Sequence, residues 1–71
     1  MNENNINISV NGEQKTVEKN KNLSEILTFL NIEKRMISIA VNSDFVPREQ
    51  YKELIINEKD AIDILTPIAG G

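Results

Sequence analysis

Apolar and polar residues alternate over residues 6–10, INISV. Side chains of a strand point alternately to its two faces, so this pattern predicts a strand with one buried face. An Asn-Gly pair follows at 11–12 and is the strongest short signal for a hairpin turn. Residues 13–18 are then expected to form the return strand. It should lie at an edge of the sheet, because only Thr16 and Val17 favour strand.

The period changes to that of a helix over residues 23–31. Four apolar residues lie at i, i+3, i+4 and i+7, along one stripe of an α-helix: Leu23, Ile26, Leu27 and Leu30. Asn22 can accept a backbone N–H bond as the N-cap, and Glu25 is placed to complete a capping box. We expect the helix to end near Asn31, with Phe29 sealing its flank.

Strand patterns return in the second half of the chain. Residues 36–42 alternate again, and residues 42–44, Asn-Ser-Asp, have turn chemistry. A short extended piece at 45–47 suits a sheet edge, because Pro47 has no N–H to donate to a strand ladder. Residues 61–66, AIDILT, predict the last strand.

One helix and one sheet, each with a single apolar side, are expected to cover each other. The sequence therefore predicts an α+β fold, with a mixed sheet of four to five strands and one main helix on one face. We expect a single domain over residues 1–66, in which residues 1–5 are frayed. Pro67 discourages regular pairing beyond Thr66, so residues 67–71 are expected to leave the domain as a flexible tail.

The composition argues against several classes of function. The chain has no histidine and no cysteine, which removes the usual general base near pH 7 and the best nucleophile. Its net charge of -3 argues against nucleic-acid binding, and no metal-ligand spacing or Gly-rich phosphate loop occurs. No apolar run is long enough to span a membrane and the N-terminus is no signal peptide, so we expect a cytoplasmic protein. We expect neither catalytic residues nor a metal site.

The last two residues, Gly70 and Gly71, remain as the candidate for chemistry. They are two of only three glycines in the chain. Without a Cβ atom they can thread a narrow site in a partner, together with Ala69. An α-carboxylate has a pKa of about 3.3–3.7, so at pH 7 it is an anion and a poor electrophile. Chemistry at Gly71 therefore requires an activating partner.

Three residues are candidates for a surface that docks such a partner. Leu65 and Ile68 flank the root of the tail, where an apolar patch indicates a binding surface. Arg48 offers a charge, although exposed single charges usually contribute little. The alternative is that the two apolar residues fold back onto the domain and Arg48 is only solvated. Asp60 and Asp63 fit a turn and a strand surface better than a catalytic pair.

Three stretches of the chain resemble a known family. Residues 22–30, NLSEILTFL, residues 39–51, IAVNSDFVPREQY, and residues 57–71, NEKDAIDILTPIAGG, are similar to the ThiS family of sulfur carriers, which has the β-grasp fold of ubiquitin. The segment VPREQ at 46–50 and the final Ala-Gly-Gly are the most specific parts. The chain departs from the family at Lys59, where a glycine is usual in the turn before the last strand.

The resemblance implies a carrier that binds no cofactor. An E1-like adenylating enzyme would use ATP and Mg to adenylate the Gly71 carboxylate, and a persulfide donor would convert it to a thiocarboxylate. Thiazole synthase would then take the sulfur in thiamine biosynthesis. The resemblance also implies that the first and last strands are central, adjacent and parallel. The alternatives are a carrier for molybdopterin synthesis, a protein modifier that forms isopeptide bonds, and a β-grasp binding module with an idle tail.

Overall fold

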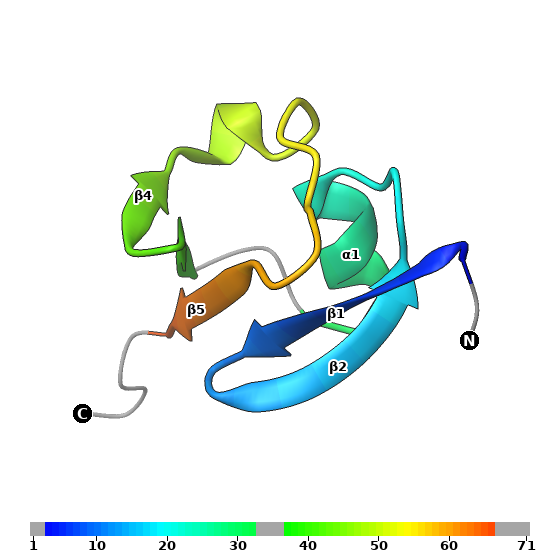
Figure 1. Cartoon of the computed structure of the whole chain (residues 1–71). Coiled ribbons are helices and arrows are strands. Elements are labelled where there is room, and N and C mark those ends of the chain that lie inside the picture. Colours follow the sequence, from blue (N-terminus) through cyan, green and yellow to red (C-terminus); the bar gives the residue numbers. More distant parts are fainter. Residues whose placement is uncertain (1–2, 33–36, 67–71) are drawn as a thin grey trace.

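The computed structural model describes residues 3–32 and 37–66. It contains a five-stranded mixed sheet with one α-helix against one face, so the predicted α+β architecture is confirmed (Figure 1). The elements are β1 (Asn5–Val10), β2 (Glu13–Glu18), α1 (Leu23–Phe29), β3 (Ser38–Val41), β4 (Asp44–Val46), the 3₁₀ helix η1 (Arg48–Gln50) and β5 (Ala61–Leu65). The predictions for the 67–71 tail, including Ile68, Ala69, Gly70 and Gly71, fall outside the described residues.

The strands lie in the order β2-β1-β5-β3-β4. The first and last strands are central and parallel, as expected, with Ser9 opposite Ala61 and Val10 opposite Ile62. The β1–β2, β3–β4 and β3–β5 pairs are antiparallel. Strands β2 and β4 occupy the two edges, which agrees with the weak pattern of the first and with Pro47 directly after the second.

Two hairpins with the same kind of turn flank the central strand β5. Asn11 and Gly12 join β1 to β2 with φ of 51° and 86°, and Asn42 and Ser43 join β3 to β4 with φ of 53° and 74°. A type I′ turn requires positive φ at both central residues, and asparagine and glycine adopt such φ values most easily. Asn11 and Asn42 therefore lie in the turns that the sequence predicted.

The helix begins at the predicted cap. The Glu25 amide donates to Asn22 Oδ1 at 2.8 Å, and the Asn22 amide donates to Glu25 Oε1 at 3.0 Å, which forms the capping box. The helix ends at Phe29, two residues before the predicted end, and Leu30 is its C-cap. Phe29 is 67% exposed, so the expectation that it seals the flank of the helix is wrong. It lies off the apolar stripe that faces the sheet.

The core lies between α1 and the sheet face that the helix covers. Leu27 is fully buried there, and Ile64 is partly buried against the same cluster. Tyr51 and Ile56, both in the segment between β4 and β5, close one side of the core. The buried side chains are Ile6, Ile8, Val10, Val17, Leu23, Ile26, Leu27, Ile39, Val41, Val46, Tyr51, Ile56 and Ile62. Within residues 3–32 and 37–66, no helix is long and apolar enough to cross a membrane.

Candidate functional site

The candidate site begins at the end of β5. This strand pairs with β1 on one side and with β3 on the other, and it runs to Leu65. Thr66 is exposed and is the last described residue before the predicted tail. The candidate site is therefore centred on the end of β5, and the loops around this strand support it.

Two large apolar side chains are exposed on the sheet face opposite α1, the outer face. The register places Asp63 of β5 opposite Ala40 of β3, and Ala40 opposite Phe45 of β4, so these three side chains share this face. Leu65, two residues after Asp63, shares it too. Phe45 is 69% exposed and Leu65 is 67% exposed. We call these four residues the β5 patch.

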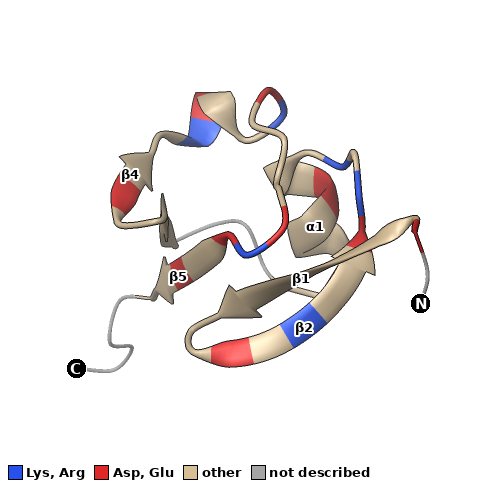
Figure 2. Cartoon of the chain, in the orientation of Figure 1, with Lys and Arg blue, Asp and Glu red and all other residues tan. Residues whose placement is uncertain are grey.

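The β5 patch carries an acidic group and no basic one. Strands β4 and β5 each contain one aspartate and neither lysine nor arginine (Figure 2). Arg48, the predicted charged contact, lies on η1, and Figure 2 shows this segment away from the end of β5. The structure therefore does not join Arg48 and Leu65 into one cluster. Phe45 was not singled out from the sequence, because its proximity to β5 depends on the strand order.

The positive charge of Arg48 acts on a buried tyrosine three residues later in the chain. Tyr51 is buried at the edge of the core. Burial raises the pKa of the Tyr51 hydroxyl above its ordinary value, and the positive charge of Arg48 opposes that shift. Tyr51 is therefore a neutral core residue at pH 7, and its environment gives no sign of a reactive group.

The aspartates near β5 have structural or surface positions. Asp60 Oδ2 accepts from the Asn57 amide at 2.7 Å, and Asp60 Oδ1 accepts from Asn42 Nδ2 at 2.9 Å. Asp63 is exposed on the outer face. In the part of the chain that the structure describes, no group of three or more carboxylates could hold a metal ion. These placements agree with a turn residue and a strand-surface residue.

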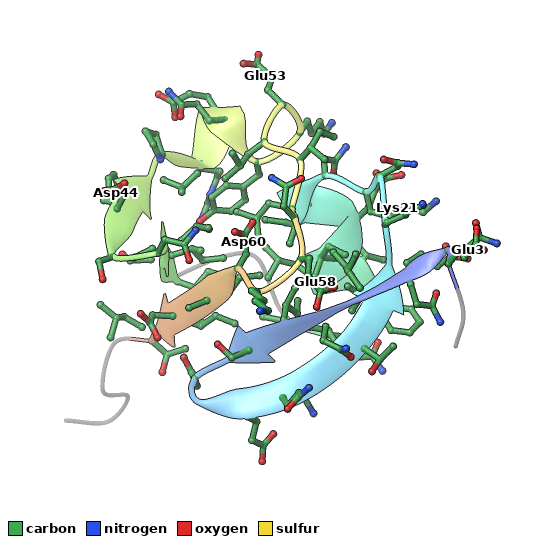
Figure 3. The ribbon with its side chains drawn as sticks, in the orientation of Figure 1. Glu3, Lys21, Asp44, Glu53, Glu58 and Asp60 are labelled. Carbon is green, nitrogen blue, oxygen red and sulfur yellow. The ribbon has the colours of Figure 1, made fainter. Side chains whose placement is uncertain are left out.

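The loop before β5 is fastened to β1. Glu58 Oε1 accepts from the Asn7 amide at 3.0 Å, and the Lys59 amide donates to the Asn7 carbonyl at 2.7 Å. Figure 3 shows Glu58 and Asp60 in this loop, just before β5. Lys59 has a φ of 70°, a conformation that favours glycine. The positive φ gives a physical reason for the glycine that the resemblance leads us to expect at this position.

Strand β5 is also held by the two turn asparagines. Asn42 Oδ1 accepts from the Ala61 amide at 2.9 Å, and the Asn42 amide donates to the Ala61 carbonyl at 2.7 Å. Asn11 Oδ1 accepts from the Ile64 amide at 2.7 Å, and its own amide donates to the Ile62 carbonyl at 2.9 Å. The sequence predicted both asparagines as turn residues only, because nothing local reveals a partner so distant in the chain.

A helix across a mixed sheet, with parallel first and last strands at its centre, defines a small β-grasp domain. The chain belongs to the ThiS family, whose model matches residues 3–71. It is similar to the crystal structure of the thiamine biosynthesis protein ThiS from Geobacter metallireducens, with a TM-score of 0.80 and 26% identity. That match covers 93% of this chain and 100% of the other. An NMR structure of a thiamine biosynthesis protein from the same organism matches with a TM-score of 0.72.

Two similar sequences widen the comparison. An uncharacterized protein, ycf40 of Porphyra purpurea, is 31% identical over 67 residues, which is 94% of each chain. A thiazole synthase of Paramagnetospirillum magneticum is 26% identical over 62 residues. This chain spans only 19% of the length of that thiazole synthase. The family and these relatives support a sulfur-carrier role related to thiamine.

Proposed function

We propose that this chain is a sulfur carrier whose reactive group is the α-carboxylate of Gly71. The observation that supports the proposal most strongly is the match to the ThiS family, which extends over residues 3–71 and so includes both glycines at its end. In this role the chain is a co-substrate of other enzymes and does not itself catalyse a reaction. It needs no bound cofactor, because ATP and Mg are used by its partner.

The first step is activation by an E1-like adenylating enzyme. The Gly71 carboxylate attacks the α-phosphorus of ATP, forms an acyl-adenylate and releases pyrophosphate. This step is needed because a carboxylate is an anion at neutral pH and resists nucleophilic attack. The need for ATP agrees with the cytoplasmic location that the sequence predicts.

The second step introduces sulfur. The terminal sulfur of a persulfide donor attacks the Gly71 carbonyl and expels AMP, which leaves an acyl group joined to the donor through two sulfurs. A thiol then attacks the donor-side sulfur, breaks the sulfur–sulfur bond and releases the thiocarboxylate, while the thiol and the donor form a disulfide. This chain contains no cysteine and no histidine, so it has neither a thiol nor an imidazole that could consume its own activated end.

Thiazole synthase is the proposed acceptor of the sulfur. The Paramagnetospirillum magneticum protein of that name contains a segment similar to most of this chain, which supports a direct association between the two functions. We propose that the β5 patch and Ile68 contact the partners, and that Arg48, which lies apart on η1, is a separate contact. Phe45 and Leu65 are exposed apolar anchors, and such residues contribute most when a partner desolvates them.

An intact-mass experiment tests the proposal. The protein is incubated with its cognate adenylating enzyme, ATP, magnesium and a persulfide donor, after its untreated mass has shown a free α-carboxylate at Gly71. The mass should rise by the difference between one sulfur and one oxygen, and fragmentation should place the change at Gly71. A chain that lacks Gly71, or that has an extra alanine after it, should fold normally and give no product.

The outcome separates the rival functions. If the wild-type chain keeps its mass under conditions in which a known carrier is converted, the sulfur-carrier proposal fails and a β-grasp binding module is favoured. If the thiocarboxylate forms but its sulfur reaches a molybdopterin precursor and not thiazole synthase, only the acceptor is wrong. A lysine isopeptide as product would instead indicate a protein modifier.

A further inference from the structure

Asn11 extends the pairing between β1 and β5 beyond the end of β1. The two strands pair at Ser9–Ala61 and Val10–Ile62, and β1 then enters its hairpin turn. The backbone of β5 continues without a β1 residue beside it. At this point the Asn11 amide donates to the Ile62 carbonyl at 2.9 Å, and the Asn11 side chain accepts from the Ile64 amide at 2.7 Å.

These two bonds reproduce what a further strand residue would provide. In a regular ladder a neighbouring residue offers one donor and one acceptor to the facing strand. Asn11 offers its backbone donor and uses Oδ1 as the acceptor, while its backbone has left the strand with a φ of 51°. The side chain therefore holds β5 two residues past the last β1 pair, close to the place where the predicted tail begins.

We propose that Asn11 is a positioning residue that fixes the direction in which the chain leaves β5 toward Gly71. This inference rests on the proposed function, because a direction matters only if a partner must receive the end of the chain. On the other side of β5, Leu65 pairs with Ser38. With Asn11 the end of the strand is held from both sides, and without its side chain the Ile64 amide loses this hydrogen bond.

Asn42 provides a matched control within the same strand. It has nearly the same φ, 53°, and its Oδ1 also accepts from a β5 amide, that of Ala61. Its side chain donates in addition to Asp60. The Asn42 bonds therefore hold the start of β5, whereas the Asn11 bond holds its end, and replacing Asn42 removes more hydrogen bonds than replacing Asn11.

Three variants remove or keep the side-chain acceptor at turn positions whose positive φ they tolerate. Asn11→Gly removes the acceptor, and Asn11→Asp keeps an oxygen acceptor at the same position. Asp-Gly and Gly-Gly are both favoured pairs for a type I′ turn, so both variants should retain the hairpin. Asn42→Gly removes the corresponding acceptor at the start of β5, again at a positive φ that glycine tolerates.

Amide hydrogen exchange tests the bond itself. Asn11→Gly should speed exchange of the Ile64 amide by about tenfold, the effect of losing one hydrogen bond, while Asn11→Asp should stay within about threefold of the wild type. Asn42→Gly should speed exchange at Ala61 and leave Ile64 unchanged. Unchanged exchange at Ile64 in Asn11→Gly would overturn the proposal.

Pyrophosphate exchange by the cognate adenylating enzyme tests the positioning. Asn11→Gly should lower kcat by about tenfold or more with a KM within about threefold, because a displaced reacting group slows the chemical step more than it weakens docking. Asn11→Asp should restore kcat to within about threefold, and Asn42→Gly should leave it within about twofold despite its greater loss of hydrogen bonds. A wild-type kcat in Asn11→Gly, or an equal loss in Asn42→Gly, would refute the role.

The wild-type reaction separates the proposed function from the role of Asn11. If the wild-type chain is not adenylated at all, the proposed function fails, and the positioning role falls with it. If the wild-type chain is adenylated and Asn11→Gly reacts equally well, the function stands and only the role of Asn11 is wrong.

Discussion

The outer face of the sheet has two halves that differ in chemistry. Over β1 and β2 it carries only polar and charged side chains: Asn5, Asn7, Ser9, Gln14, Thr16 and Glu18. Over β3, β4 and β5 it exposes two large apolar side chains, Phe45 and Leu65, among the smaller or polar side chains of Ser38, Ala40 and Asp63. A solvated face of an antiparallel sheet is normally polar, as the first half is. The second half departs from that pattern, and it does so beside the end of β5.

The exposed apolar half is the surface that we propose a partner covers. Exposing two large apolar side chains to water has no benefit for folding, whereas a partner that covers them gains from their burial. In the polar half, a side-chain hydrogen bond joins β2 to β1, in which Thr16 Oγ1 donates to Asn7 Oδ1 at 2.9 Å.

The largest effect should come from the inner face, whose core is covered by α1 and by the segment between β4 and β5. Leu27→Ala removes a fully buried side chain and should lower the free energy of unfolding by about 2–5 kcal/mol. Phe29→Ala, on the exposed side of the same helix, should change it by less than about 0.5 kcal/mol. Urea unfolding measures both. An equal loss of unfolding free energy in Leu27→Ala and Phe29→Ala would mean that the helix does not turn Leu27 toward the sheet and Phe29 toward solvent.

The second prediction separates the two halves of the outer face. Replacing Phe45 and Leu65 together by serine should raise KM for adenylation or for sulfur transfer by about tenfold or more, because exposed apolar anchors contribute to docking. Replacing Gln14 and Thr16 by alanine on the polar half should change KM by less than about twofold. Thermal unfolding should show that all these variants remain folded. A similar KM for both double variants would remove the β5 patch as a docking surface.

The third prediction concerns the loop of residues 57–60, which precedes β5 and is hydrogen-bonded to β1. Lys59 adopts a φ of 70°, so Lys59→Gly should raise the free energy of unfolding by up to about 1 kcal/mol through relief of backbone strain. Lys19, which is exposed and is not among the positive-φ residues, gives the control. Lys19→Gly should leave stability unchanged or slightly lower, and a gain there equal to that at Lys59 would contradict the strain argument.

The smallest expected effect concerns the pH dependence of stability that the buried Tyr51 hydroxyl causes. Burial raises the pKa of Tyr51 above the value of about 10 that tyrosine has in an unfolded chain. At a pH between the two pKa values, the Tyr51 hydroxyl thus keeps its proton in the folded state and loses it in the unfolded state. The resulting stability is fully present below about pH 10 and is lost as pH rises through the folded pKa.

Tyr51→Phe keeps the ring and removes this dependence. Above about pH 10 the wild type should lose thermal stability relative to the variant, while below about pH 9 their difference should be constant. Lysine titration affects both proteins equally, so the difference isolates the hydroxyl. A difference that stays constant through the alkaline range would show that burial does not perturb Tyr51.

The sequence by itself determined the local elements of this protein. The alternation of apolar and polar residues predicted strands, and the 3.6-residue period of apolar residues predicted the helix. The pair Asn22 and Glu25 predicted where the helix begins. These features depend on residues within a few positions of one another, so they are visible in the chain. The resemblance to a family supplied the strand order and pointed to Gly71, which lies outside the described residues.

The tertiary structure alone decided which distant residues meet. Phe45 and Leu65 share one surface only because β3 lies between β4 and β5. Phe29 lies off the apolar stripe, and only the packing shows that nothing covers it there. Asn11 binds Ile64 across 53 positions of the chain. An asparagine in a turn has the same sequence pattern whether or not its side chain finds a partner, because the partner is chosen by the packing of the whole sheet.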